Sequence, residues 1–212
     1  MVGGMPMAEF KGVIFDCDGV MFESRRANLA YYNDILTYFG ADPVNENDRE
    51  KADLCHAAAS PEVLLHLLGE ERRDAALEFA ATIDYRKFIP CMDPEPGLHD
   101  ALARLSESLP LAVATNRGSS MPAVLAHFEL NRYFSTVVTS RDVERPKPHP
   151  DMLLLAISRL GLDNADVLFV GDSIYDKKAA EQAGIAFAAY KPSFEVPLSL
   201  ESHAQLTEYV LG

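Results

Sequence analysis

The chain has 212 residues, and 32 Asp and Glu residues against 19 Lys and Arg residues give it a net charge of −13 at pH 7. Hydrophobic residues make up 48% of the sequence and charged residues 24%, so the chain can bury a sizeable core and is not a disordered acidic tail. A strongly acidic protein is poorly suited to bind a phosphate backbone or an anionic lipid surface. We therefore expect neither a nucleic acid nor a membrane as a partner.

The N-terminal segment and the cysteines bear on the cellular compartment. Residues 1–9 contain no basic region followed by an apolar stretch, which a secretory signal would require. Cys17, Cys55 and Cys91 are widely spaced and form no CxxC pair. This pattern is typical of reduced thiols rather than of a disulfide framework or a zinc site, and it predicts a cytoplasmic protein.

The first predicted element is a short apolar strand at residues 12–16, and a long helical region follows it. From about residue 23 to residue 90 the apolar residues have helical spacing, and no segment has the pattern of a strand. Ser60 is expected to cap a helix that has Pro61 in its first turn. The helices expected in this region are residues 26–39, 52–59, 61–68 and 72–85.

Strands and helices alternate after a proline-containing segment at residues 89–97. Helices are expected at residues 97–108, 121–128 and 151–160, and apolar strands at residues 111–115, 136–139, 167–171 and 185–190. This alternation predicts a doubly wound, Rossmann-like α/β fold with about five parallel strands. We expect residues 1–22 and 91–212 to form this core, and residues 23–90 to form an all-helical inserted domain.

Polar residues with catalytic potential follow the predicted strands. In open α/β sheets, ligands bind beyond the carboxyl ends of the strands. The residues expected at this edge are Asp16, Asp18, Thr115, Asn116, Lys147, Asp172 and Asp176. Four carboxylates, a hydroxyl group and a lysine should therefore lie close together.

This set of residues is suited to phosphoryl transfer. Several neighbouring carboxylates cannot all stay ionised without a cation, and oxygen ligands that leave room for water and phosphate suit Mg²⁺. Mg²⁺ and Lys147 would offset the negative charge of a phosphoryl group. Asp16 can attack phosphorus to form an aspartyl phosphate, and Asp18 can protonate the leaving oxygen and then activate water.

Four motifs in the sequence resemble those of the haloacid dehalogenase-like hydrolases, and most closely the phosphoglycolate phosphatase and β-phosphoglucomutase branch. They are Asp16-Cys17-Asp18-Gly19-Val20, Thr115-Asn116, Lys147-Pro148 and Gly171-Asp172-Ser173-Ile174-Tyr175-Asp176. The resemblance covers nearly the whole chain and implies that the inserted helices form the family's cap domain. The dehalogenase branch lacks an acid at the position of Asp18, so the resemblance favours phosphoryl transfer over carbon–halogen hydrolysis.

The resemblance also implies roles for individual residues. Asp16 would be the nucleophile and Asp18 the general acid and base. Thr115 and Lys147 would hold the phosphoryl oxygens, with help from the backbone N–H of Asn116.

A magnesium site is implied by the same resemblance. The Asp16 carboxylate, the Asp18 backbone carbonyl and the Asp172 carboxylate would bind Mg²⁺. Asp176 would support the metal, either directly or through another ligand. Mg²⁺ is thus the expected cofactor.

Three further residues are candidates for substrate recognition. His56 lies where the family's cap brings a loop toward the active site, and Arg49 is a cap candidate of the same class. Arg117 follows Thr115-Asn116 and could reach a substrate anion, although its place in a loop favours a solvated side chain. Residues 52–60 contain no familiar glycine-centred cap motif, so the sequence does not identify the substrate.

The leading hypothesis is a Mg²⁺-dependent phosphatase that acts on a small phosphorylated metabolite. A phosphomutase of the β-phosphoglucomutase type would use the same four motifs, and only the cap would distinguish it. A receiver-like phosphoacceptor would also place aspartates, a threonine and a lysine around Mg²⁺, but such domains are short and lack a helical insertion. We expect a monomer or a homodimer.

Overall fold

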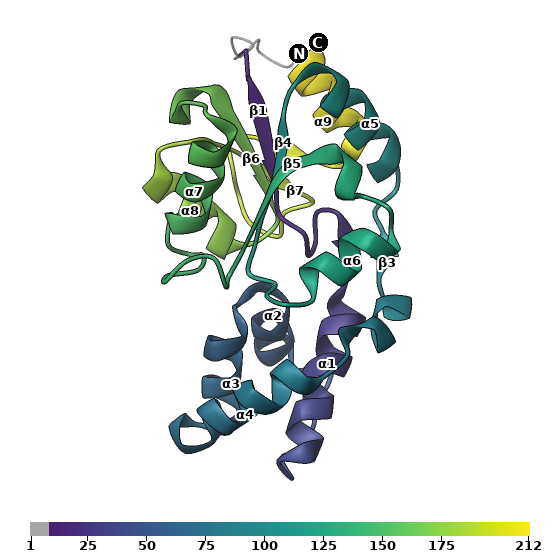
Figure 1. The fold of residues 1–212 in the computed structure, drawn as a ribbon, viewed down its shortest axis with the longest axis vertical. Helices are drawn as coiled ribbons and strands as arrows, with labels where there is room; N and C mark the ends of the chain where they lie inside the picture. The colour runs from purple at the N-terminus through teal and green to yellow at the C-terminus, as the bar shows by residue number, and fades with distance from the viewer. Residues whose placement is uncertain (1–8) are drawn as a thin grey trace.

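The computed structural model describes residues 9–212, and its centre is a six-stranded parallel sheet (Figure 1). The strands are ordered β5-β4-β1-β6-β7-β8. Their bounds are β1 Gly12–Phe15, β4 Leu111–Thr115, β5 Phe134–Thr139, β6 Val167–Gly171, β7 Ala186–Tyr190 and β8 Ser199–Leu200. The prediction of a doubly wound α/β fold is confirmed. Within the described residues, no helix is both long and apolar enough to cross a bilayer.

Helices cover both faces of the sheet because its strands are apolar on both sides. In β1, Val13 and Phe15 pack into one core, and Ile14 packs into another on the opposite face. Side chains of α5, α6 and α9 fill the first core, and side chains of α7 and α8 fill the second. These helices are α5 Leu98–Ser108, α6 Met121–His127, α7 Asp151–Leu160, α8 Ile174–Ala183 and α9 His203–Leu211. The continuous apolar runs in the sequence are the result of this burial on two faces.

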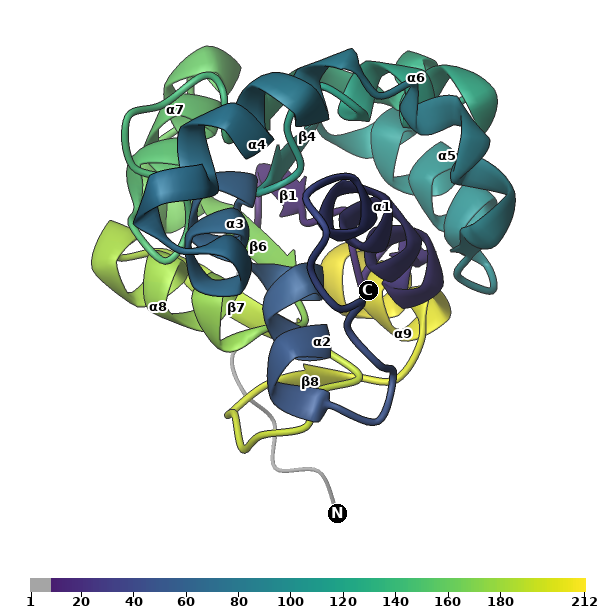
Figure 2. The same ribbon diagram turned by 90° about the horizontal axis from the view of Figure 1, so that it is seen from below.

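The helical insertion lies beyond the carboxyl ends of the strands and has a core of its own. Figure 2 shows its four helices in front of the sheet. They are α1 Arg25–Tyr38, α2 Arg49–Ala57, α3 Ser60–Leu68 and α4 Glu70–Thr82. Ile35 and Leu36 of α1 pack with Val63 and Leu64 of α3, and this cluster is separate from the two cores of the sheet. The cap therefore stands over the edge where the polar residues gather.

A short ribbon joins the cap to the sheet domain. Its strands are β2 Phe22–Glu23 and β3 Asp93–Pro94, which pair antiparallel. Two 3-10 turns, Tyr85–Lys87 and Ile89–Cys91, lie between α4 and β3. The chain thus enters and leaves the cap side by side, so the two crossings form one connection.

Some element boundaries differ from the predictions for physical reasons. The sixth strand, β8, and the ribbon strands have only two residues each, too few to produce a periodic pattern. The expectation that Ser60 caps α3 was wrong, because Ser60 is already the first helical residue and its Oγ lies 3.0 Å from the Tyr32 hydroxyl. The N-terminal segment expected to lack a secretory signal lies, except for Glu9, outside the described residues.

Candidate active site

A buried lysine joins two carboxylates at the carboxyl edge of the sheet. Lys147 Nζ lies 2.8 Å from Asp16 Oδ1 and 2.6 Å from Asp176 Oδ1. Its side chain is only 1% exposed. Carboxylate oxygens of Asp16, Asp172 and Asp176 all lie within 4.8 Å of one another. The structure therefore brings these predicted residues together, and a single lysine lies among three carboxylates.

The start of α8 holds two of these carboxylates in place. Ser173 and Asp176 form a capping box, in which the Ser173 Oγ accepts a hydrogen bond from the Asp176 backbone N–H. The Asp176 Oδ2 in turn accepts hydrogen bonds from Ser173 Oγ at 2.6 Å and from the Asp172 backbone N–H at 3.2 Å. Because Lys147 takes its other oxygen, Asp176 is engaged on both sides. It is thus placed to position Asp172 and Lys147.

Gly19 in the first motif allows Asp172 to approach the loop after β1. Its φ is +76°, in the left-handed region that favours glycine. A Cβ atom at this position would lie 2.0 Å from Asp172 Oδ2. Glycine at position 19 is therefore favoured by packing as well as by backbone conformation.

Burial and crowding shift the titration of this cluster. Burial, together with the neighbouring Asp176, Asp172 and Asp18, raises the pKa of Asp16 to about 8, although Lys147 acts in the opposite direction. Burial also raises the pKa of Asp172. Burial alone would lower the pKa of Lys147, but the carboxylates of Asp16 and Asp176 raise this pKa above the ordinary value. The lysine is therefore protonated, and the cluster carries more negative potential than it can neutralise alone.

The donor set fits a hard divalent cation. Asp16 Oδ1 is buried, and although it is in ion-pair contact with Lys147 it accepts no hydrogen bond from the described residues. Three clustered carboxylates with an incompletely satisfied oxygen suit Mg²⁺, which prefers oxygen ligands. The Asp18 carboxylate is not part of this cluster, so any contribution from that residue would come from its backbone, as the resemblance implies.

The raised pKa of Asp16 predicts how added Mg²⁺ should act at different pH values. Because the folded pKa exceeds the unfolded value, the protonated carboxyl stabilises the metal-free fold at low pH, and this contribution is lost as the pH rises toward about 8. Metal binding requires the ionised carboxylate. The increase in Tm on adding Mg²⁺ should therefore be larger near pH 8 than near pH 5, as measured by differential scanning fluorimetry. An equal or larger increase at the lower pH would contradict this assignment.

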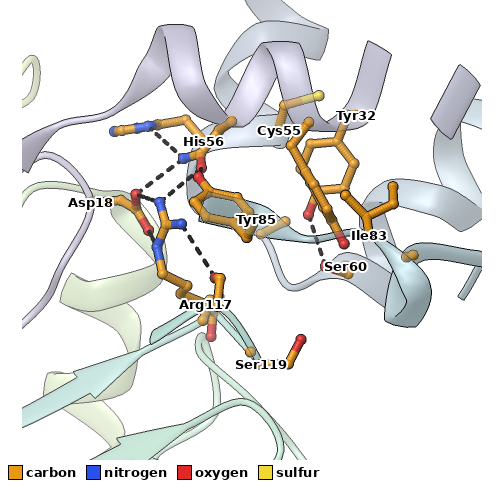
Figure 3. Close-up of a pocket in the computed structure, with 16 residues that line it drawn as sticks. Asp18, Tyr32, Cys55, His56, Ser60, Ile83, Tyr85, Arg117 and Ser119 are labelled. Carbon is orange, nitrogen blue, oxygen red and sulfur yellow. Dashed lines mark hydrogen bonds and ion pairs between the residues drawn. The ribbon is translucent and has the colours of Figure 1, made fainter. Parts of the chain in front are cut away.

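Asp18 points away from the cluster toward the cap, where Arg117 holds it. Arg117 Nε donates to Asp18 Oδ2 at 3.2 Å, and Nη2 donates to Oδ1 (Figure 3). Ser24 Oγ and Asn28 Nδ2 also donate to Oδ1. Burial alone would raise the pKa of Asp18, but Arg117, and to a smaller extent His56 and Ser24, lower it to about 2. Asp18 is thus ionised in this arrangement.

Arg117 is buried, and the expectation of a solvated loop side chain was wrong. The side chain is 3% exposed, and its guanidinium carbon lies 4.7 Å from the centre of the Tyr85 ring. Nη2 also donates to Asn28 Oδ1 at 2.9 Å. The sequence could not show this, because the contacts come from two cap segments far from Arg117 along the chain.

Thr115 and Asn116 lie at the end of β4, next to these groups. Both are buried. Thr115 Oγ1 accepts a hydrogen bond from the Arg117 backbone N–H, and Asn116 Nδ2 donates to the Lys147 carbonyl at 3.0 Å and to the Ala57 carbonyl at 2.9 Å. Asn116 therefore connects the lysine loop to the cap.

Of the two cap candidates, the structure brings one to the site. His56 is buried, with Nε2 3.6 Å from Asp172 Oδ2 and Nδ1 3.5 Å from Asn28 Nδ2. Burial opposes its protonation, but Asp172 and Asp18 raise its pKa above the ordinary value. Arg49 is exposed at the start of α2 and does not line the cavity that contains Asp18 and His56.

Sequence reasoning missed three residues that surround Asp18 and Arg117. Ser24 and Asn28 contact Asp18, and Tyr85 donates to Asn28 Oδ1 at 3.0 Å while its ring packs on Arg117. All three are buried. A polar Ser24 and Asn28 at the start of an otherwise apolar helix face was the only available signal.

A parallel sheet with a helical cap over a carboxylate and lysine cluster defines a capped α/β enzyme of phosphoryl transfer. A family model described as haloacid dehalogenase-like hydrolase matches residues 13–190. The chain is also 30% identical over 204 residues to a phosphoglycolate phosphatase of Shigella boydii, a match that covers 83% of this chain and 79% of the relative. The chain therefore belongs to the haloacid dehalogenase-like hydrolases, and it is a phosphatase that resembles the phosphoglycolate phosphatases.

Solved structures agree with this family and fold. A subfamily IA hydrolase of the superfamily from Geobacter sulfurreducens is 38% identical, with a TM-score of 0.81 over 94% of this chain and 98% of the other. CbbY from Rhodobacter sphaeroides, solved in complex with phosphate, has a TM-score of 0.78 at 20% identity, covering 93% of this chain and 96% of the other. The second likeness concerns the fold alone.

Proposed function

We propose that this protein is a Mg²⁺-dependent phosphatase that hydrolyses a small phosphomonoester through an aspartyl phosphate on Asp16. The observation that carries the proposal is the buried cluster in which Lys147 contacts Asp16 and Asp176 while Asp172 lies within reach of both. Asp18 lies two residues from the nucleophile, which suits proton transfer to and from the reacting groups. The cap above excludes bulk water.

In this proposal the chain's own residues perform two half-reactions. A carboxylate oxygen of Asp16 attacks phosphorus, the bond to the alcohol oxygen breaks, and Asp18 supplies a proton to that oxygen. Water then attacks the aspartyl phosphate, Asp18 accepts its proton, and the Asp16 carboxylate and inorganic phosphate are released. The pKa of about 2 leaves Asp18 in the ionised state needed for the second half-reaction, and Asp18 must take up a proton before it can serve as the acid of the first.

Charge neutralisation is the role of the remaining groups. Lys147 offsets the negative charge of the transferred group, and Thr115 and the Asn116 backbone N–H are proposed to bind its oxygens. Asp16 and Asp172, with Asp176 behind them, would hold Mg²⁺. When bound, this ion supplies additional positive charge at the phosphoryl oxygens.

The cavity between cap and sheet favours a small leaving group. Its volume is about 70 Å³, and Asp18, His56, Asn116 and Arg117 are among its lining residues. On this measure a single water needs roughly 10–15 Å³, so the space admits several small groups. Phosphoglycolate is therefore the first substrate to test, since curated relatives carry that name.

We also propose a cytoplasmic protein whose partner is its small phosphorylated substrate. Its three cysteines are free, and two of them, Cys17 and Cys55, are buried. Free thiols suit a reducing compartment. A monomer or a homodimer would serve this activity equally.

A screen of phosphorylated metabolites tests the proposed function. Phosphate release should occur for small phosphomonoesters with Mg²⁺ and fall to background when EDTA removes the metal. Sugar phosphates should be assayed in parallel for isomerisation, which a phosphomutase would catalyse. If no compound gave metal-dependent phosphate release, the proposed function would be wrong.

A further inference from the structure

The cap is joined to the sheet domain by one connection, so contacts elsewhere must decide whether it is open or closed. The ribbon of β2 and β3 carries both chain crossings. In Figure 1, β3 lies on the right of the molecule, whereas α3 of the cap and α8 of the sheet domain lie on the left. A contact between α3 and α8 would therefore hold the cap on the side away from its connection.

Tyr175, in the first turn of α8, makes such a contact with the cap. Its hydroxyl donates to Glu62 Oε1 at 2.6 Å, and Glu62 is in the first turn of α3. The Tyr175 ring also packs against the apolar cluster of the cap that includes Val63 and Leu64. The other partly buried residues that pack against this cluster all belong to the cap. Tyr175 thus reaches from the sheet domain into the cap through both a hydrogen bond and an apolar contact.

The other polar side-chain contacts between cap and sheet domain involve groups of the proposed site. Within residues 9–212, these contacts join the cap to Asp18, Asn116, Arg117 and Asp172. Some of these groups must change partners in the proposed reaction, because Asp18 takes up and releases a proton and Asp172 would bind a metal. The hydroxyl of Tyr175 is hydrogen-bonded to none of the four. Its contact with the cap therefore does not depend on the state of the reacting groups.

We propose that Tyr175 and Glu62 form a latch that holds the cap closed over the site. Tyr175 is then a positioning residue, which acts through the cap rather than on the substrate. The proposed reaction needs a closed cap to exclude bulk water and an open cap to exchange substrate and product. The latch sets the balance between these two states while the site is empty.

The three cysteines of the chain make opening of the cap measurable. Cys55 is buried in the cap and lines the cavity between cap and sheet, so it becomes accessible when the cap opens. Cys17 is buried in a core of the sheet domain and becomes accessible when that domain unfolds. Cys91 is partly exposed and serves as the internal reference. Alkylation followed by peptide mass spectrometry measures all three rates in one sample.

Loss of the Tyr175 hydroxyl should open the cap more often. In the substrate-free protein, Tyr175→Phe should raise the rate of Cys55 alkylation by roughly tenfold, which corresponds to about 1.4 kcal/mol and is the order of one net hydrogen bond. Glu62→Ala should give a similar increase. The double variant should give no further increase, because both substitutions remove the same interaction. Glu62→Gln keeps an acceptor oxygen and should give a smaller increase.

Two controls separate opening of the cap from loss of structure. Tyr209→Phe removes the hydroxyl of a partly buried tyrosine that has no hydrogen-bond partner within residues 9–212, and it should leave the Cys55 rate unchanged. In the latch variants the Cys55 rate should depend only weakly on urea, because opening an intact cap exposes less surface than unfolding it. Cys17 should remain unreactive in every variant.

The outcomes decide the latch independently of the proposed function. An unchanged Cys55 rate in Tyr175→Phe and Glu62→Ala would overturn it. A parallel rise of the Cys17 and Cys55 rates, or a steep dependence on urea, would also overturn it, because the pair would then stabilise the fold rather than the closed state. These measurements need neither substrate nor metal, so an absence of phosphate release would overturn the proposed function and leave the latch standing.

Discussion

Replacing Asp16 with asparagine should reduce kcat for phosphate release by roughly 10³-fold or more, equivalent to about 4 kcal/mol of transition-state stabilisation. The amide cannot attack phosphorus as the carboxylate does. Asp16 is the carboxylate that contacts Lys147 from the end of β1. The fold should be retained, because the substitution removes one negative charge from a cluster in which three carboxylates share one lysine. Steady-state assays and circular dichroism measure both effects.

Asp163→Asn is the matched control for this substitution. Asp163 is an exposed aspartate whose side chain caps no helix, so its replacement should change neither activity nor stability. An Asp16→Asn enzyme that kept a tenth or more of wild-type activity would contradict the assignment of Asp16 as the nucleophile.

Replacing Lys147 with methionine should impair both stability and catalysis. Removing one partner of a buried ion pair typically costs about 3–5 kcal/mol, and here it leaves Asp16 and Asp176 without their shared cation. Loss of a single group that stabilises developing charge lowers kcat by roughly 10²–10³-fold. Denaturant unfolding and kinetic assays should show both losses, and added Mg²⁺ should restore part of the stability.

Two comparisons sharpen the test of Lys147. Lys177→Met removes a lysine of α8 whose ion pair with Glu181, at 4.0 Å, is partly exposed, and it should cost less than about 1 kcal/mol. Combining Lys147→Met with Asp176→Asn should recover stability, since the double variant buries one unpaired carboxylate fewer. Full stability in Lys147→Met alone would show that the buried pairs do not hold the site together.

The arrangement of the carboxylate and lysine cluster could be predicted because it follows from topology. Parallel strands end at one edge, so Asp16, Thr115 and Asp172 had to meet there once their strands were placed correctly. Lys147 is not at a strand end, but it lies in the loop that leads from β5 to α7 and returns to the same edge. The aspartates and the threonine lie at the last residue of a strand or directly after it, so the sheet determines where they are placed.

The residues on the cap side could not be predicted in the same way. Arg117 is buried because Asn28 and Tyr85, from two distant cap segments, surround it. Whether a loop arginine is solvated depends on how a second domain is oriented over it, and local sequence does not encode that orientation. His56 and Arg49 illustrate the same limit, because both belong to α2 and yet one is buried in the site while the other is exposed.

Acid-quench trapping of the enzyme during turnover tests the central claim most directly. The protein would be mixed with phosphoglycolate and Mg²⁺, quenched in acid within the first turnover, digested, and analysed by mass spectrometry. We predict one added phosphoryl group on the peptide that contains Asp16, its loss when turnover is complete, and its absence in Asp16→Asn. Turnover without any phosphorylated Asp16, or a phosphoryl group on another residue, would contradict the account.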